Sequence, residues 1–426
     1  MIARIGAPHI RSQRGAASLA VVSVLALALL LAVGHAARQL AVEQRASANQ
    51  LRSTQAFEAA EAGVAWALAM LARGERVDAV CETTTDPARL PFRDARLAFD
   101  AARGTLAPRA WNDAGTPRPV RAACAWRNDA WTCSCPEAAA PSLPVGGGPA
   151  FVVELTPGPA AGLHTLVAVG CTRADGDCAD GSAGPHDAAA RIETVLGLVP
   201  ALRAAPLAAL TLQGDVGADV AWHIRRDDAA VGGIAVHAGG SSASAPLLGI
   251  AGPAGSPRAA LVADGDAALA GLAVDRLFAR HAGVAPTAWS ERPGVARIRC
   301  ASRCDTAVAD ALATGATVLH LSSDSVPPSP VVLHGPLALG TADRPVAIAV
   351  AGDLRLDGAV VLTGFLHAQS LHWSGSGGRV RGAVAVAGAV SGSGDPTLVH
   401  DLAVLERLRS ATGSLAPLPG SWKDFR

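Results

Sequence analysis

The chain has 426 residues, 50% of them hydrophobic, so it can bury a large core and is long enough for two or three structural units. Lys and Arg together number 36, Asp and Glu also number 36, and the formal net charge is therefore zero. This balance gives no reason to expect nucleic acid as a partner. No basic patch with interleaved aromatic residues changes that expectation.

The N-terminal region contains an apolar segment with basic residues in front of it. No charged residue lies between Gly15 and Gly34, and the eighteen residues 16–33 would span roughly 27 Å as a helix. That length is just sufficient to cross a bilayer. Three arginines and no acidic residue precede it: Arg4, Arg11 and Arg14. The positive-inside rule then places the N-terminus in the cytoplasm and the rest of the chain outside it.

A helix-favouring segment follows the apolar one. Residues 37–73 contain no proline and are rich in Ala, Leu, Gln, Glu and Arg, which are good helix formers. Phe57, Val64 and Leu68 are spaced seven and four residues apart, which places them on one face of a helix. A cleaved secretory signal would be shorter and would be followed by an unrelated domain. We expect one continuous helix over 16–73, and a plain membrane anchor with a helical stalk explains this pattern equally well.

Two short motifs accompany this predicted helix: QRGAASL at residues 13–19 and AFEAAEAG at residues 56–63. The first resembles the leader of type IV prepilins, and the second resembles the signature of the PilX family of minor pilins. In that family the prepilin peptidase cleaves after the leader glycine and methylates the new N-terminus. The resemblance implies cleavage between Gly15 and Ala16, with residues 1–15 as the leader. The residues that carry the signature are Phe57, Glu58, Glu61 and Gly63.

The resemblance implies a minor pilin that anchors in the bacterial inner membrane, with its body in the periplasm and later on the surface of a pilus. Most pilins carry a glutamate at the fifth mature position, where it pairs with the N-terminal amine of a neighbour in a low-dielectric environment. That position is Ala20 here. The departure implies a role in initiating assembly, at or near the filament tip and not in the shaft.

The same resemblance implies the partners. They are other minor pilins, the major pilin, the prepilin peptidase, the inner-membrane assembly platform and the lipid of the inner membrane, with room for a tip adhesin. One alternative is a K-type pseudopilin at the tip of a type II secretion pseudopilus. Another is a membrane-anchored periplasmic β-solenoid protein that acts on polysaccharide.

Eight cysteines lie beyond the predicted membrane span, and an even number of exported cysteines favours disulfides. Sequence proximity suggests that Cys171 pairs with Cys178 and that Cys300 pairs with Cys304. The remaining four are left to pair among themselves: Cys81, Cys124, Cys133 and Cys135. A zinc site is the alternative for three of these, but no histidine lies nearby and the usual two-residue spacing is missing. We therefore expect disulfides and no metal ion.

The exported part is expected to be β-rich, which makes the whole chain an α+β protein with its long helix packed on a headpiece. Residues 74–200 form the predicted disulfide-containing headpiece, with apolar strands at 151–155, 165–169 and 192–196. A boundary is expected near residues 200–206.

The region 206–426 contains short apolar runs separated by glycines such as Gly352, Gly364 and Gly382. Runs of this spacing are typical of the stacked rungs of a β-solenoid, and an ordinary sandwich is the alternative. Two helical inserts are predicted, at 266–280 and 305–313, the second with Asp305 as its N-cap and Gly315 at its end.

The sequence contains no G-x-S-x-G elbow, no Walker loop and no H-E-x-x-H helix. His367 and His372 lie five residues apart, and His320 lies near hydroxyl and carboxyl side chains, but chance explains both groupings. Asp353 and Asp357 are interpreted as turn residues. We therefore expect no catalytic residue and no cofactor, as befits an assembly protein.

Overall fold

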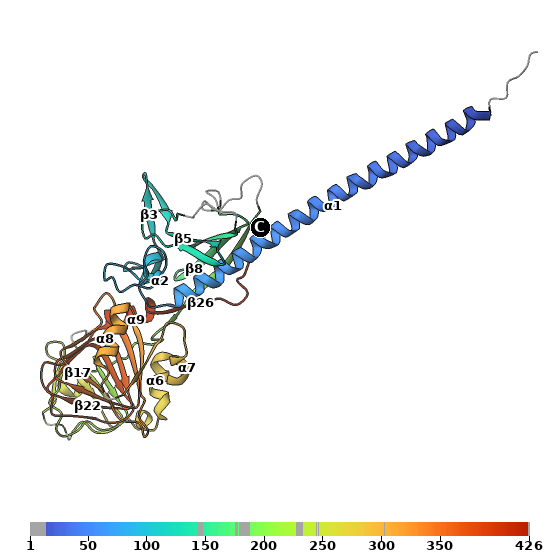
Figure 1. Cartoon of the computed structure of the whole chain (residues 1–426). Helices are drawn as coiled ribbons and strands as arrows, with labels where there is room; N and C mark the ends of the chain where they lie inside the picture. Colours follow the sequence, from blue (N-terminus) through green and yellow to red (C-terminus); the bar gives the residue numbers. More distant parts are fainter. Residues whose placement is uncertain are drawn as a thin grey trace, which may run out of the picture.

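The structure is a computed structural model that describes residues 14–142, 148–174, 178, 188–226, 233–243, 245, 247–301 and 303–424. Residues 1–13 of the expected leader lie outside this part of the chain. The architecture is a long N-terminal helix followed by a β-rich body with several sheets, so the expected α+β class is confirmed. Figure 1 shows the helix extending far beyond the body.

Helix α1 (Arg14–Ala72) is continuous over 59 residues, which corresponds to roughly 88 Å. The expected helix over 16–73 is therefore present, and Gly15 and Ala16 lie in its first turn. Only the C-terminal part of α1 packs on the body, where Ala56, Ala60 and Ala67 are buried. The structure divides α1 into an exposed part over residues 17–55, called the free helix below, and a docked part over residues 56–72.

The headpiece is an antiparallel sheet of six strands in the order β26-β9-β8-β7-β5-β6. The three strands predicted here are present within β7 (Ala150–Pro157), β8 (Leu163–Cys171) and β9 (Ala189–Pro200). The short helix α2 and two hairpins lie beside this sheet. The remaining headpiece elements are α2 (Phe92–Arg96), β1 (Leu97–Asp100), β2 (Thr105–Pro108), β3 (Ala110–Asp113), β4 (Thr116–Pro119), β5 (Arg121–Arg127), β6 (Ala130–Ser134) and β26 (Gly413–Pro417).

The headpiece does not end at the expected boundary near residue 200. Its edge strand β26 comes from the C-terminal end of the chain, where Leu415 pairs with Leu198 of β9. Lys423 continues this antiparallel contact by pairing with Glu193. The predicted unit 206–426 is therefore divided, because its last segment belongs to the headpiece.

The structure joins the eight cysteines in four disulfides. Cys171 pairs with Cys178 and Cys300 with Cys304, as sequence proximity suggested. The other four form the pairs Cys81–Cys135 and Cys124–Cys133. The three thiolates considered for zinc are therefore used in covalent bonds within the headpiece.

The second unit is built from two sheets in which every strand pair is parallel, one with twelve strands and one with four. Many paired strands follow one another closely in the chain, although the step varies: Leu354 pairs with Leu371, which is 17 residues later, Gly364 with Gly382, 18 residues later, and Val318 with Ala347, 29 residues later. Parallel pairing between segments that follow one another in the chain is typical of stacked solenoid rungs. It differs from the antiparallel pairing in the sheets of a sandwich.

The strands of the large sheet are β10 (Leu210–Leu212), β11 (His223–Arg226), β12 (Val236–Ala238), β13 (Gly249–Ala251), β14 (Val262–Ala263), β15 (Ala296–Cys300), β16 (Val318–Ser323), β18 (Leu337–Leu339), β19 (Val346–Ala351), β21 (Val360–Ala368), β23 (Arg379–Val386) and β25 (Thr397–His400). Those of the small sheet are β17 (Val331–His334), β20 (Asp353–Asp357), β22 (Ser370–Ser374) and β24 (Val390–Ser391). A core containing Trp222 and Trp373 lies between them.

Two glycines that were expected to separate strands lie inside them. Gly364 is part of β21 and Gly382 is part of β23, with φ angles of 149° and 137°. A Cβ atom at Gly382 would overlap the backbone oxygen of Gly364. These glycines therefore allow neighbouring rungs to approach closely, and the predicted breaks there are wrong. Gly352 does separate two strands, β19 and β20.

The solenoid is assembled from two arms of the chain. β23 pairs with β25 through its first residues and with β10 through its last residues, so segments about 190 residues apart extend the same rung stack. β11 and β12, then β13 and β14, continue the stack on that side. The chain then crosses the face of the large sheet and begins the other end of the stack at β15.

Helices cover one face of the large sheet. The insert predicted at 266–280 is divided into α5 (Ala267–Ala270) and α6 (Val274–Ala282), with α7 (Pro286–Ser290) after them. Leu277, Phe278 and Trp289 form a core with α9 (Leu402–Ser410) and this sheet face. The other helices are α4 (Arg258–Leu261) and α8 (Asp305–Thr314). Helix α8 ends at Gly315 as predicted, but its N-cap is Cys304 and not Asp305.

Candidate assembly surface on the N-terminal helix

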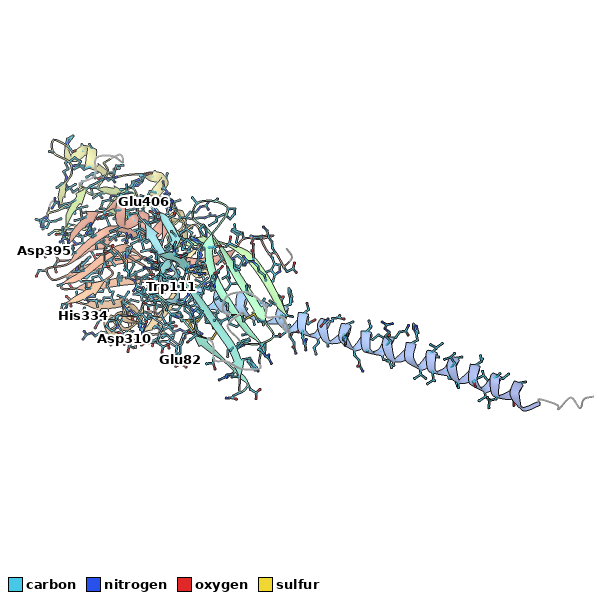
Figure 2. The ribbon with its side chains drawn as sticks, turned by 90° about the horizontal axis from the view of Figure 1, so that it is seen from above. Glu82, Trp111, Asp310, His334, Asp395 and Glu406 are labelled. Carbon is cyan, nitrogen blue, oxygen red and sulfur yellow. A yellow bond between two sulfur atoms is a disulfide. The ribbon has the colours of Figure 1, made fainter. Side chains whose placement is uncertain are left out.

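The free helix, residues 17–55 of α1, presents apolar side chains on every side. Its large hydrophobic residues are between 58% and 72% exposed, and Figure 2 shows them projecting along the free helix. Within the described residues, α1 is the one helix long and apolar enough to span a membrane. Because apolar surface of this extent is unfavourable in water, lipid or other protein chains are expected around it. The residues are Leu19, Val21, Val22, Val24, Leu25, Leu27, Leu29, Leu30, Leu31, Val33, Leu40, Val42 and Leu51.

The free helix extends beyond the predicted membrane span. Residues 35–54 are all exposed and would measure roughly 30 Å. Leu40, Val42 and Leu51 lie in this stretch, at 58%, 62% and 60% exposure. This part of the helix lies between the lipid-length segment and the body, so its apolar residues need protein neighbours.

Charged residues of the free helix lie on opposite faces. Arg38, Arg45 and Arg52 recur every seven residues, so they share one face apart from a drift of about 20° per heptad. Glu43 is five residues from Arg38 and therefore lies about 140° further round the helix axis at about 100° per residue. Glu43 is the one acidic residue among residues 17–55. A row of arginines with one glutamate on the opposite side suits side-by-side contact with another helix of complementary charge.

The small residues of the AFEAAEAG motif form the docking face of α1. Ala56 and Ala60 are fully buried against β8, where they face Gly170. A Cβ atom at Gly170 would overlap the backbone of both residues. Gly63 also lies close to the sheet, since a Cβ atom there would lie 3.1 Å from the ring of Phe151. The motif thus lets the helix backbone lie directly on the strands.

The larger signature residues divide between the core and the solvent. Phe57 is half-buried and packs against the headpiece core, whereas Glu58 and Glu61 are exposed. The two glutamates therefore face away from the sheet. Sequence reasoning found this motif but not its partners Gly170 and Phe151, although a glycine within the apolar run of β8 is a signal for close backbone approach.

An aromatic cluster fixes the end of α1 in the headpiece. The ring of Trp66 contacts Phe92 edge-on, with centroids 5.2 Å apart, and lies 5.6 Å from Phe151. Trp131 of β6 completes the cluster at 4.8 Å from Phe151. Aromatic contacts of this geometry contribute about 0.5–1.5 kcal/mol each beyond their buried area. These rings therefore hold the C-terminal end of α1 against the headpiece.

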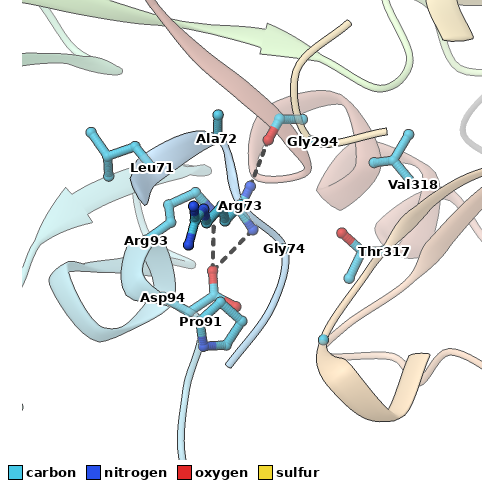
Figure 3. A pocket seen from close by; sticks show the side chains of 12 residues that line it. Leu71, Ala72, Arg73, Gly74, Pro91, Arg93, Asp94, Gly294, Thr317 and Val318 are labelled. Atoms are coloured by element: carbon cyan, nitrogen blue, oxygen red, sulfur yellow. Dashed lines mark hydrogen bonds and ion pairs between the residues drawn. The ribbon is translucent and has the colours of Figure 1, made fainter. Parts of the chain in front are cut away.

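The headpiece in turn is joined to the solenoid close to the end of α1. Arg76 donates its backbone N–H to the carbonyl oxygen of Thr314 at 2.7 Å. The backbone N–H of Ala201 likewise donates to the carbonyl oxygen of Thr412 at 2.8 Å, where the chain passes between the two units. Figure 3 shows the small pocket at this junction, between Leu71, Gly74 and Val318. Helix, headpiece and solenoid thus meet at one junction.

The histidines considered for chemistry lie apart from this surface. His367 is buried beneath α6 against Phe278, and burial lowers its pKa to about 3. His372 lies on the small sheet and contacts Ser391 at 3.0 Å. Within the described residues, no group of three or more His, Cys, Asp or Glu side chains is arranged to hold a metal ion.

No protein-family model, curated protein or solved structure matches this chain. The geometry itself defines a class: a helix of membrane-spanning length, docked on a disulfide-bonded antiparallel sheet that carries a parallel β-solenoid. The free helix is the surface on which the most large apolar side chains are exposed, so it is the candidate site for contact with lipid or other chains.

Proposed function

We propose that this protein is a minor pilin, anchored in the bacterial inner membrane by α1, which takes part in initiating type IV pilus assembly. The observation that carries the proposal is the division of α1 at its AFEAAEAG motif. Small residues dock the helix on the headpiece, and residues 17–55 before them are left as an exposed apolar rod. Such a rod suits storage in lipid followed by packing among the helices of other subunits.

The proposed place is at or near the filament tip. Ala20 is exposed on the free helix where most pilins carry a glutamate, so this subunit lacks the carboxylate that pairs with a neighbour's N-terminal amine. The bulky solenoid at the far end of the body also favours a terminal position (Figure 1). In this role the body is periplasmic before assembly and surface-exposed afterwards, and the partners are other pilins and the assembly platform.

Site-specific photo-crosslinking in cells tests the proposal. A photoreactive residue at Leu40, on the free helix, is expected to form crosslinks to other pilin subunits only when the assembly platform is present. The same group at Arg118, on the β3–β4 hairpin, is the matched control and should not form them. Crosslinks at Leu40 that do not depend on the platform would refute the proposal. Lost enzyme secretion in a deletion strain, with surface pili intact, would instead identify a secretion pseudopilin.

A further inference from the structure

A second candidate site lies between the headpiece and the solenoid, and it does not depend on the proposed assembly role. It is a pocket of about 330 Å³, which is at the lower end of the range for small-molecule sites. Both units contribute to it. The headpiece supplies α2, β1 and the residue that follows β2, while the solenoid supplies the loop before β19 and helix α9.

The charged lining of this pocket is unbalanced. Four arginines face two aspartates, which leaves an excess of two positive charges. Arg109 donates Nε–H to Leu97 O at 3.4 Å and is paired with no carboxylate among the described residues. Arg407 pairs with Asp343 at 3.0 Å, but that carboxylate is 91% exposed and is therefore well screened by water. The lining arginines are Arg93, Arg109, Arg344 and Arg407.

Asp94 is shared by two of these arginines. Its Oδ1 lies 2.9 Å from Nη2 of Arg93, and its Oδ2 lies 3.5 Å from Nη2 of Arg344. Figure 3 shows the contact between Arg93 and Asp94 at the adjoining pocket. Burial lowers the pKa of Arg344, Asp94 opposes this effect, and the nearby Arg76 and Arg93 lower it further. A single carboxylate, that of Asp94, therefore forms ion pairs with two guanidinium groups.

The uncharged part of the lining is mostly apolar, with Thr317 and Thr412 as its polar members. Leu97 and Leu106 are buried, and Phe99 lies beneath the guanidinium of Arg407 at 4.4 Å from its ring centroid. Arg344 is held from the solenoid side by a 2.9 Å hydrogen bond to Gly315 O. The pocket thus combines guanidinium groups, of which Arg93 and Arg344 are held by short contacts, with a largely nonpolar wall. Guanidinium groups bind carboxylates and phosphates in a bidentate manner.

We propose that this pocket binds a small organic anion at the junction of the two units. The anion's carboxylate or phosphate group lies among Arg109, Arg344 and Arg407. Its apolar part lies against Phe99 and Leu106. Because the pocket is lined by both units, the bound anion also strengthens their contact.

Calorimetric titration of the full chain in detergent micelles tests this proposal with three probes at constant ionic strength. Benzoate and phenyl phosphate each carry an apolar ring and an anionic group, and the comparison between them distinguishes a carboxylate from a phosphate ligand. Benzamide has nearly the shape of benzoate without its charge. Saturable binding of at least one anion, at one site per chain and tighter than benzamide, is expected.

The variants R109Q and R344Q should each weaken this binding about tenfold or more, since each removes a charge-assisted hydrogen-bond donor. R109Q alters an exposed side chain and is expected to fold. It therefore tests the proposal even if the R344Q variant does not fold. R118Q, on the exposed β3–β4 hairpin and paired with Asp113 at 3.5 Å, is the control and should bind as the unaltered chain does. Equal affinity for benzamide and benzoate, no saturable binding below about 10 mM, or unchanged binding in R109Q would each overturn the proposal.

Discussion

Gly170 of β8 lies directly against Ala60 of α1, so closely that a Cβ atom at position 170 would overlap the helix backbone. This contact explains why the buried face of the motif consists of small residues. The helix lies on the sheet backbone, and the larger side chains Trp66 and Phe151 fix it from the side.

Replacing Gly170 with alanine should destabilise the chain by about 1–3 kcal/mol, because the added methyl group pushes α1 off the sheet. Denaturant unfolding in detergent, followed by tryptophan fluorescence, measures the change. Gly197 of β9 is the matched control in the same sheet, since a Cβ atom there would only touch Leu418 and Leu163 at 3.4 and 3.5 Å. G197A should be close to neutral, and equal effects of the two substitutions would contradict the docking account.

The disulfides should contribute unequally to stability. Cys81–Cys135 closes a loop with a separation of 54 residues, whereas Cys124–Cys133 joins neighbouring strands with a separation of 9. In the chain-entropy description, closing these loops stabilises the folded chain by about 4 kcal/mol for Cys81–Cys135 and about 2.6 kcal/mol for Cys124–Cys133. The double variant C81A/C135A should therefore lower the unfolding free energy more than C124A/C133A. The opposite order in urea unfolding would show that strand pairing, and not loop closure, dominates.

Two buried histidines should make the solenoid sensitive to acid. Burial lowers the pKa of His281 to about 4 and that of His367 to about 3, with Arg280 and His281 respectively adding to the effect. The unfolded chain binds these protons near pH 6.5, so it gains protons first as the pH falls. The contribution of these two histidines to the unfolding free energy is thus fully present above about pH 6.5. Below that pH it declines by up to about 1.4 kcal/mol per pH unit for each histidine.

The variant H367F should reduce this pH dependence, because phenylalanine keeps a planar ring beside Phe278 without a titrating group. Thermal unfolding between pH 7.5 and 4.5 provides the measurement. L277A, which removes a fully buried side chain from α6, the helix that covers His367, should lower stability at every pH and leave the slope unchanged. An unaltered slope in H367F would exclude a contribution from this histidine.

The rung formed by β25 should couple the two arms of the solenoid. Leu398 of β25 pairs with Val380 on one side and Ile224 on the other, and it is 1% exposed. L398A should cost about 2–5 kcal/mol and increase hydrogen exchange in both arms. L319A, near the far end of the stack, is the comparison and should affect mainly β15, β16 and β19. If L398A loosened only one arm, the arms would be independent.

Local patterns predicted much of this structure because the relevant contacts are local. The apolar run and the AFEAAEAG motif indicate α1, and short apolar runs indicate β7, β8 and β9. The glycine-punctuated runs indicate solenoid rungs, but they do not say which rung lies beside which. Each rung exposes similar apolar edges, so the pairing of β10 with β23 depends on how the two arms meet.

Other features depend on residues far apart in the chain. β26 joins β9 across more than two hundred residues, and no short pattern marks it as a headpiece strand. The anion pocket likewise gathers arginines from separate segments, each of which has the ordinary appearance of a surface residue in the sequence. Only the docking of the two units brings Arg109, Arg344 and Arg407 to one cavity.

The proposed function depends on α1 staying attached to the body after its leader is removed. Mass spectrometry of the N-terminus of the protein, from cells with and without the prepilin peptidase, tests this most directly. We predict a chain that begins at N-methylated Ala16 when the peptidase is present and a leader-bearing chain when it is absent. A mature chain that keeps its leader in both strains, or one that begins beyond the apolar rod, would contradict the account.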